Sequence, residues 1–175
     1  MTLKGCRSRR SDALGRLKQA GAGLFLAALS GCAPLPTVGA AGIPPISPPQ
    51  ARIWVYRDLQ SSAIPARPFV RLNGTIAGIA DQGGAFYRDV LPGHYHVTVD
   101  STGTDVNQSS DVTLAAGQEA YIHIVQLDNW DESVGGKFEN QRPTFYAWLT
   151  APDVARVAVW RSIDYGGGPL AAATR

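Results

Sequence analysis

Apolar and polar residues alternate along much of the chain beyond residue 50, a pattern typical of strands with one buried face. The clearest case is the segment 94–100, in which Tyr95, Val97 and Val99 fall on one face and two histidines on the other. One face of this strand should therefore pack against a hydrophobic core. Similar runs, rich in β-branched and aromatic residues, predict strands at residues 52–57, 69–72, 75–79, 85–90, 94–100, 111–114, 119–126 and 143–149.

Short glycine-containing turns separate these strands. Asn73-Gly74 supplies the two positive φ angles that a type I′ hairpin turn requires, and Gly83-Gly84, Leu91-Pro92-Gly93 and Ala116-Gly117 mark further turns. The regular spacing of the strands favours an antiparallel sandwich or barrel. We expect an all-β fold, an antiparallel β-sandwich of about seven or eight strands. A parallel α/β fold is excluded because the pattern lacks the helices that it needs.

The pattern changes near the C-terminus. Thr150-Ala151-Pro152-Asp153 resembles a capping box with proline in the first turn, and Val154, Val157 and Ala158 follow it at helical spacing. These features predict a short helix, and a ninth strand through residues 157–160 is the alternative. We expect the glycine-rich tail, residues 166–175, to be disordered, so that the domain spans residues 51–165.

The N-terminus has the three parts of a secretory signal: a basic stretch as far as Lys18, an apolar run at residues 20–29, and then small residues. The run is too short for a transmembrane helix. It ends in Leu29-Ser30-Gly31-Cys32, which resembles the lipobox read by lipoprotein signal peptidase. We therefore predict a signal peptide over residues 1–31, cleavage between Gly31 and Cys32, and lipid on the Cys32 thiol. The alternatives are a cleaved signal in which Cys32 is incidental, and an uncleaved anchor.

Residues 32–50 contain the lipidated cysteine and six of the twelve prolines, without a charge. Such a segment forms neither a helix nor a central strand, and it extends at about 3.1 Å per residue. We predict a spacer that holds the domain away from the bilayer. The alternative is a docking segment for a partner with a polyproline groove.

Charge and cysteine content refine this picture. Residues 1–31 hold six of the sixteen basic residues and one of the fourteen acidic ones, so the rest of the chain is mildly acidic. This removes the electrostatic case for binding nucleic acid. Cys6 lies in the segment expected to be removed, which leaves Cys32 alone and predicts no disulfide. Because Ala33 is not aspartate, resemblance to enterobacterial sorting rules favours the outer membrane, with the domain facing the periplasm.

The chain combines the lipobox and the proline spacer with the Ile53–Arg57 strand, Leu72-Asn73-Gly74, Leu91-Pro92-Gly93-His94-Tyr95 and Ala116-Gly117-Gln118-Glu119-Ala120-Tyr121. Together these features resemble the bacterial lipoproteins of domain-of-unknown-function family 2846, over roughly residues 51–126. Its turn-and-strand motif also occurs in other sandwich domains, including the PEGA repeats. The resemblance implies a lipoprotein without assigned catalytic residues.

Few residues indicate a catalytic or metal-binding role. The sequence contains no glycine-rich phosphate loop, His-Glu-x-x-His pattern or Gly-x-Ser-x-Gly elbow, so we do not expect an enzyme or a cofactor. His94, His96 and His123 are the one set that could hold zinc. Because histidines are common on the solvated face of a strand, we predict no metal site, and zinc binding by this set is the alternative.

Aromatic and acidic residues are the remaining candidates. Residues 128–142 form a predicted polar loop, whose carboxylates we expect to be solvated. Trp130 in this loop is a candidate contact for a partner, and packing over the sheet edge is its alternative. Trp54, Trp148 and Trp160 lie in apolar runs and should belong to the core.

The sequence therefore predicts a membrane-anchored lipoprotein with a non-catalytic binding or structural module that acts through a protein partner of the cell envelope. A module that binds a small ligand, a glycan or zinc is the alternative. A hydrolase without a recognisable motif is a third class.

Overall fold

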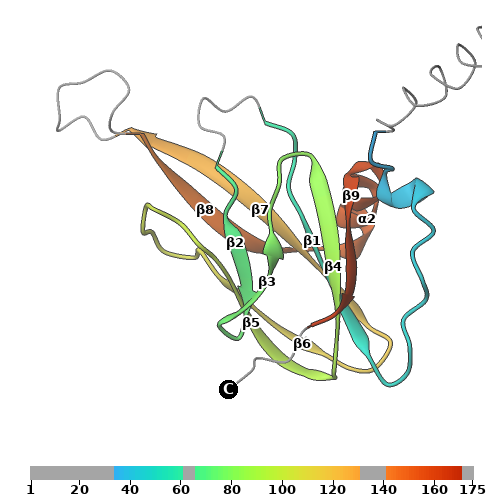
Figure 1. Ribbon diagram of the computed structural model, residues 1–175. Helices are drawn as coiled ribbons and strands as arrows, with labels where there is room; N and C mark the ends of the chain where they lie inside the picture. Colours follow the sequence, from blue (N-terminus) through green and yellow to red (C-terminus); the bar gives the residue numbers. More distant parts are fainter. Residues whose placement is uncertain (1–33, 61–65, 131–140, 171–175) are drawn as a thin grey trace, which may run out of the picture. The chain divides into compact units, whose positions relative to one another are not determined.

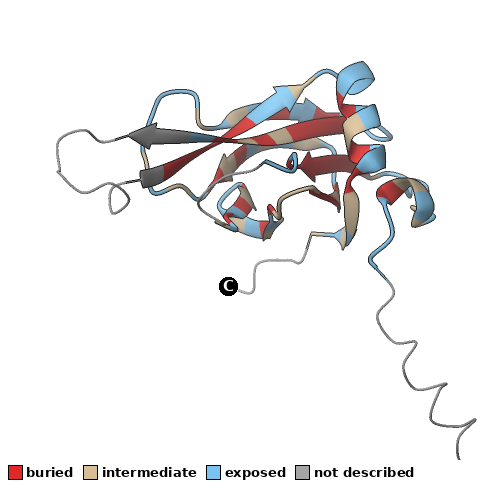
Figure 2. Ribbon diagram, turned by 90° about the horizontal axis from the view of Figure 1, so that it is seen from above, coloured by how far each residue is buried: buried red, intermediate tan, exposed pale blue. Residues whose placement is uncertain are grey.

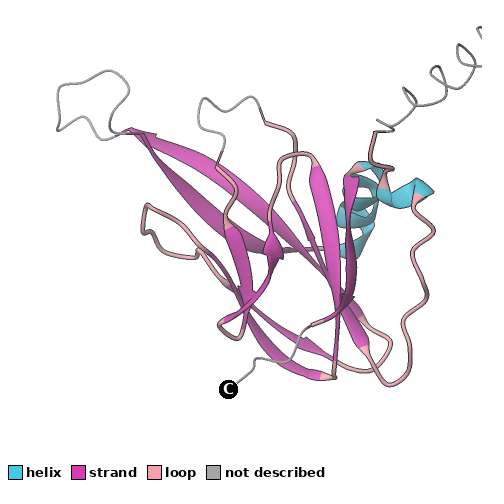
Figure 3. Ribbon diagram, in the orientation of Figure 1, coloured by secondary structure: helices cyan, strands magenta, loops and turns pink. Residues whose placement is uncertain are grey.

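Two β-sheets and one short α-helix make up most of the computed structural model, which describes residues 34–60, 66–130 and 141–170 (Figures 1 and 3). One sheet has the strand order β8-β7-β1-β4-β9 and the other β3-β2-β5-β6. The elements are η2 (Val38–Ala40), β1 (Ala51–Tyr56), β2 (Phe69–Leu72), β3 (Thr75–Ile79), β4 (Gly84–Val90), β5 (Gly93–Val99), β6 (Ser110–Leu114), β7 (Glu119–Trp130), β8 (Gln141–Thr150), α2 (Pro152–Arg161) and β9 (Ile163–Pro169).

All eight predicted strands are confirmed, and the helix at residues 152–161 is confirmed in place of the alternative strand. The predicted capping box is wrong. Ala151 is the N-cap and provides no side-chain hydrogen bond, whereas Pro152 does occupy the first turn. Among the residues that the structure describes, no helix has the length and apolar character needed to cross a membrane.

The prediction of a purely antiparallel fold is wrong for two strand pairs. β1 runs parallel to β7, and β4 runs parallel to β9. Between β1 and β7 the chain forms β2 and β3 of the other sheet, returns to the first sheet as β4, and then forms β5 and β6 of the other sheet. Helix α2 lies between β8 and β9. Local turn signals identify hairpins between neighbouring strands, so they carry no information about these long-range pairs.

The predicted disordered tail is also corrected, because residues 163–169 form β9, a ninth strand, along β4. A Cβ atom on Gly167 would lie 2.1 Å from Cε1 of Tyr87, so the strand approaches this ring more closely than a side chain would permit. Gly167, one of the glycines that suggested disorder, thus permits this close contact. Residues 171–175 of the predicted tail lie outside the described residues.

The predicted spacer is wrong from Thr37 onward. Thr37 forms a β-bridge with Ile163, and the backbone N–H of Val38 donates to Ser162 O at 2.9 Å. Val38 is buried in a cluster that includes side chains of α2, and Ile43 packs against the same cluster. From Leu35 the chain forms one compact unit, because these apolar side chains cover the helix. The predicted signal peptide and Cys32 lie outside the described residues.

Two hydrophobic clusters cover opposite faces of β1, whose six residues are all buried (Figure 2). Ile53 and Val55 belong to a cluster that joins side chains of both sheets. Trp54 and Tyr56 belong to the second cluster, together with Ala155 and Val159 of α2. The prediction of a buried Trp54 is confirmed. The same prediction is wrong for Trp148 and Trp160, which are 43% and 64% exposed.

Candidate functional site

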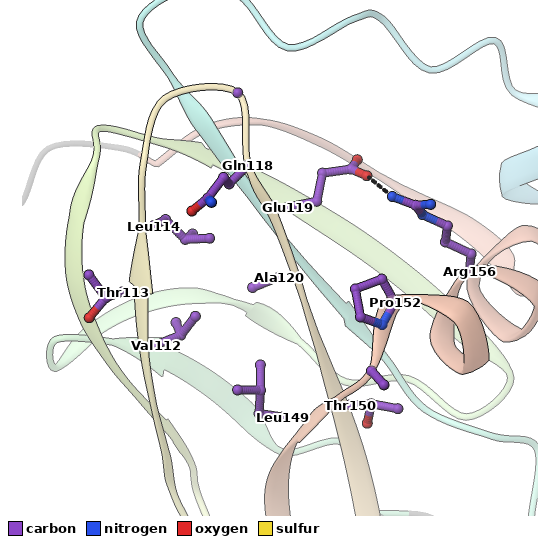
Figure 4. Close-up of a pocket in the computed structure, with 12 residues that line it drawn as sticks. Val112, Thr113, Leu114, Gln118, Glu119, Ala120, Leu149, Thr150, Pro152 and Arg156 are labelled. Atoms are coloured by element: carbon purple, nitrogen blue, oxygen red, sulfur yellow. Dashed lines mark ion pairs between the residues drawn. The ribbon is translucent and has the colours of Figure 1, made fainter.

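A groove of about 590 Å³ lies where β6, at the edge of one sheet, faces β7, β8 and the start of α2 (Figure 4). Its lining combines buried apolar side chains of β6 and β7 with a more exposed polar rim. The apolar part consists of Val112, Leu114, Ala120, Leu149 and Pro152, and the polar part includes Thr113, Gln118, Glu119, Thr150 and Arg156.

Ser110 joins the two sheets at one end of β6. Its hydroxyl group donates to Ala147 O at 2.7 Å and accepts a hydrogen bond from the N–H of Leu149 at 3.0 Å. The N–H of Ala147 donates to Gln108 O at 3.0 Å. Beyond Ser110, residues 112–114 line the groove together with Leu149. The edge strand is therefore fixed at one end and borders the groove farther along.

Three side chains contact the carboxylate of Glu119 at the groove. Trp54 Nε1–H donates to its Oε1 at 3.2 Å, and the Tyr121 hydroxyl group donates to its Oε2 at 2.8 Å. Arg156 Nη2 lies 3.6 Å from the same Oε2, an ion pair that Figure 4 marks at the groove. Burial raises the pKa of Tyr121, which keeps the phenol protonated as a donor. The carboxylate is thus held in place by three side chains.

A second cavity of about 270 Å³ shares Glu119 and Arg156 with the groove. It lies beneath residues 38–44 and includes the rings of Trp54, Tyr121 and Trp160. Aromatic rings beside a few polar groups are typical of sites for small organic molecules. This cavity is therefore a candidate ligand site.

The structure does not bring the three histidines together, so it does not support the alternative of a three-histidine zinc site. His94 and His96 lie on β5, whereas His123 lies on β7 of the other sheet. His123 stacks on Tyr56, with ring centroids 4.6 Å apart, and its Nε2 lies 3.0 Å from Asp58 Oδ2. Within the described ranges, no group of three or more His, Cys, Asp or Glu residues is arranged to hold a metal ion.

His94 and His96 instead flank Asp111 on the outer face of β5 and β6. His96 Nδ1 lies 2.9 Å from Asp111 Oδ1, and His94 Nε2 lies 3.3 Å from it. The hydrogen bond with His96 is the main reason why the pKa of Asp111 lies below its ordinary value.

We expect the His96→Gln substitution to raise the pKa of Asp111 towards that of an isolated aspartate, about 3.9. NMR titration of the Asp111 carboxyl carbon measures this change. Because folding lowers this pKa, the contribution of Asp111 to stability is present above the ordinary value and disappears as the pH falls through the lowered one. An unchanged Asp111 pKa in the variant would contradict the assignment to His96.

Trp130 is the last residue of β7 and pairs with Gln141, so the predicted loop starts later and ends earlier than expected. Its side chain and residues 131–140 lie outside what the structure describes, as does the predicted cleavage site at Gly31 and Cys32. The partner contact at Trp130 stays a prediction.

Sequence patterns missed Glu119, Tyr121 and Arg156. The first two were assigned to a strand and the third to a helix, but no local motif indicates that they meet. No protein-family model matches the chain, and a search of curated proteins finds no match either. The resemblance to family 2846 therefore remains a prediction.

Proposed function

We propose that this chain is a lipid-anchored, non-catalytic binding module of the cell envelope, with its two sheets packed as a β-sandwich. In this proposal, lipid on Cys32 anchors it in the outer membrane, facing the periplasm. The groove between β6 and β8 binds an extended segment of a protein partner. The groove is the single observation that carries this function, and the lipobox supports the location.

The groove suits an extended peptide for two reasons. β6 is the last strand of its sheet, so its outer edge offers backbone donors and acceptors to an added strand. Val112 and Leu114 form the buried apolar part of the groove, and Leu149 is 51% exposed beside them. Together they give an apolar surface for alternate side chains of the added strand. Arg156 and Glu119 add charge at the rim. Glu119 is already held by three side chains, which favours a positioning role over a reactive one.

We expect Leu149→Asp to abolish capture of the partner by the full-length protein, because it places a charge on the apolar surface of the groove. The measurement is affinity capture from native envelopes after crosslinking. Ile76→Asp is the matched control, since Ile76 is 49% exposed on β3, at the opposite edge of the four-stranded sheet. Equal capture by both variants would contradict binding in the groove.

The aromatic cavity supports a second function, binding of a small ligand such as a glycan. Trp54 and Tyr121 provide rings and Arg156 provides a hydrogen-bond donor. Titration with glycans, followed by tryptophan fluorescence, tests this function. A response that persists in Leu149→Asp would assign the ligand to this cavity and not to the groove.

A further inference from the structure

Helix α2 exposes an apolar stripe on the face that points away from the sheet. The helix buries Ala155 and Val159, whereas Val154, Val157 and Trp160 are 63%, 53% and 64% exposed. Residues at this spacing lie along one side of a helix. In Figure 2 the outer surface of the helix is pale blue and its inner surface is red. A short helix thus presents large apolar side chains, including a tryptophan, to its surroundings.

Basic and further apolar residues surround this stripe. Arg156 and Arg161 border a hollow on the helix surface together with Val157 and Trp160. A second hollow joins Val154 and Val157 to Leu59, which is 81% exposed. Apolar side chains with a tryptophan and flanking arginines are typical of helices that lie in the interface of an anionic membrane. Tryptophan favours this depth because its ring is amphipathic.

The position of the predicted anchor indicates that a membrane covers the exposed stripe of α2. The chain from Cys32 to Thr37 spans five residues and can extend at most about 18 Å. Thr37 is bridged to Ile163, and Val38 donates to Ser162 O, immediately after the last residue of α2. A lipid on Cys32 would therefore lie within a short distance of the C-terminal end of the helix. Residues 37–44 of the predicted spacer contact the domain, so they do not hold it away from the bilayer.

We propose that the outer face of α2, formed by Val154, Val157 and Trp160 with Arg161, docks on an anionic lipid bilayer beside the anchor. This inference rests on the proposed lipid at Cys32. The anchor holds the helix at a high local concentration near the bilayer, so a small apolar stripe is sufficient for stable contact. The domain then rests on the membrane in a fixed orientation.

The test uses the full-length protein, expressed with its signal and reconstituted into vesicles of phosphatidylethanolamine and phosphatidylglycerol. A Val157→Cys variant carries an environment-sensitive fluorophore, and Ile76→Cys, similarly exposed on β3, is the matched control. We expect a blue-shifted label at residue 157 that is quenched several-fold more by brominated lipids than the label at residue 76. Replacing phosphatidylglycerol with phosphatidylcholine should weaken this quenching, because Arg161 loses its anionic lipid partners.

Mass spectrometry of the same sample separates the two proposals. Lipid on Cys32 together with an unquenched, water-exposed label at residue 157 would overturn the docking inference and leave the anchor intact. A chain without lipid on Cys32 would overturn the proposed anchor, and the docking inference with it. A shielded label that brominated lipids do not quench would also overturn docking, since it would indicate a second copy of the chain on this face.

Discussion

Replacing Asp89 with alanine should lower the free energy of unfolding by about 3–5 kcal/mol, because the change leaves a buried guanidinium group without its counter-ion. Arg52 and Asp89 are opposite each other on β1 and β4. Arg52 Nε and Nη2 donate to the two carboxylate oxygens at 2.7 and 3.1 Å, and both side chains are at least nine-tenths buried. The guanidinium carbon also lies 4.0 Å from the ring centroid of Tyr87. Urea denaturation of the variant measures the loss.

Two controls test whether the unpaired charge is the cause. The double variant Arg52→Met with Asp89→Leu should recover much of the lost stability, because apolar side chains of similar volume often replace a buried ion pair without penalty. Asp100→Ala removes the carboxylate of the exposed pair with Arg71 and should have a far smaller effect. If the double variant were less stable than Asp89→Ala, the explanation by an unpaired charge would be wrong.

Arg57→Met should destabilise the fold by about 2–5 kcal/mol, because buried carbonyl groups lose a charged donor. Arg57 follows β1, is 1% exposed and is the largest fully buried side chain of the described core. Its Nη1 donates to Ala66 O at 2.7 Å and to Ala80 O at 3.1 Å, which flank the β2–β3 hairpin of the other sheet. Its Nη2 donates to Gln126 of β7. The side chain therefore ties the two sheets together.

Thermal unfolding followed by circular dichroism measures this effect. Arg71→Met is the control, since the side chains of Arg71 and its partner Asp100 are 34% and 44% exposed. A change in Arg57→Met no larger than that in the control would contradict the role of Arg57 as a link between the sheets.

Local patterns predicted the strands well, because alternation and turn chemistry act over a few residues. The hairpin at Asn73-Gly74 is an example, since both residues adopt the positive φ angles that the turn requires. The parallel partners of β1 and β4 were not predictable in this way. The burial of β1 on both faces was not predicted either, because its second covering layer, α2 with Val38, depends on residues far away in the sequence.

Predictions based on composition were wrong for segments whose structure depends on tertiary packing. Residues 37–50 were expected to be a free spacer because of their prolines, yet Val38 contributes an apolar side chain to the fold. The three histidines were grouped by residue type, but two of them lie on one sheet and the third lies on the other. Glu119, Tyr121 and Arg156 come together through tertiary structure alone, so no sequence motif could have identified them.

The proposed location and the docking inference both depend on the lipid at Cys32, and mass spectrometry of the protein purified from native membranes tests it most directly. We expect the N-terminal peptide to begin at Cys32 and to carry the mass of a diacylglyceryl group. A mature chain that retains residues 1–31, or one with an unmodified Cys32, would contradict the account.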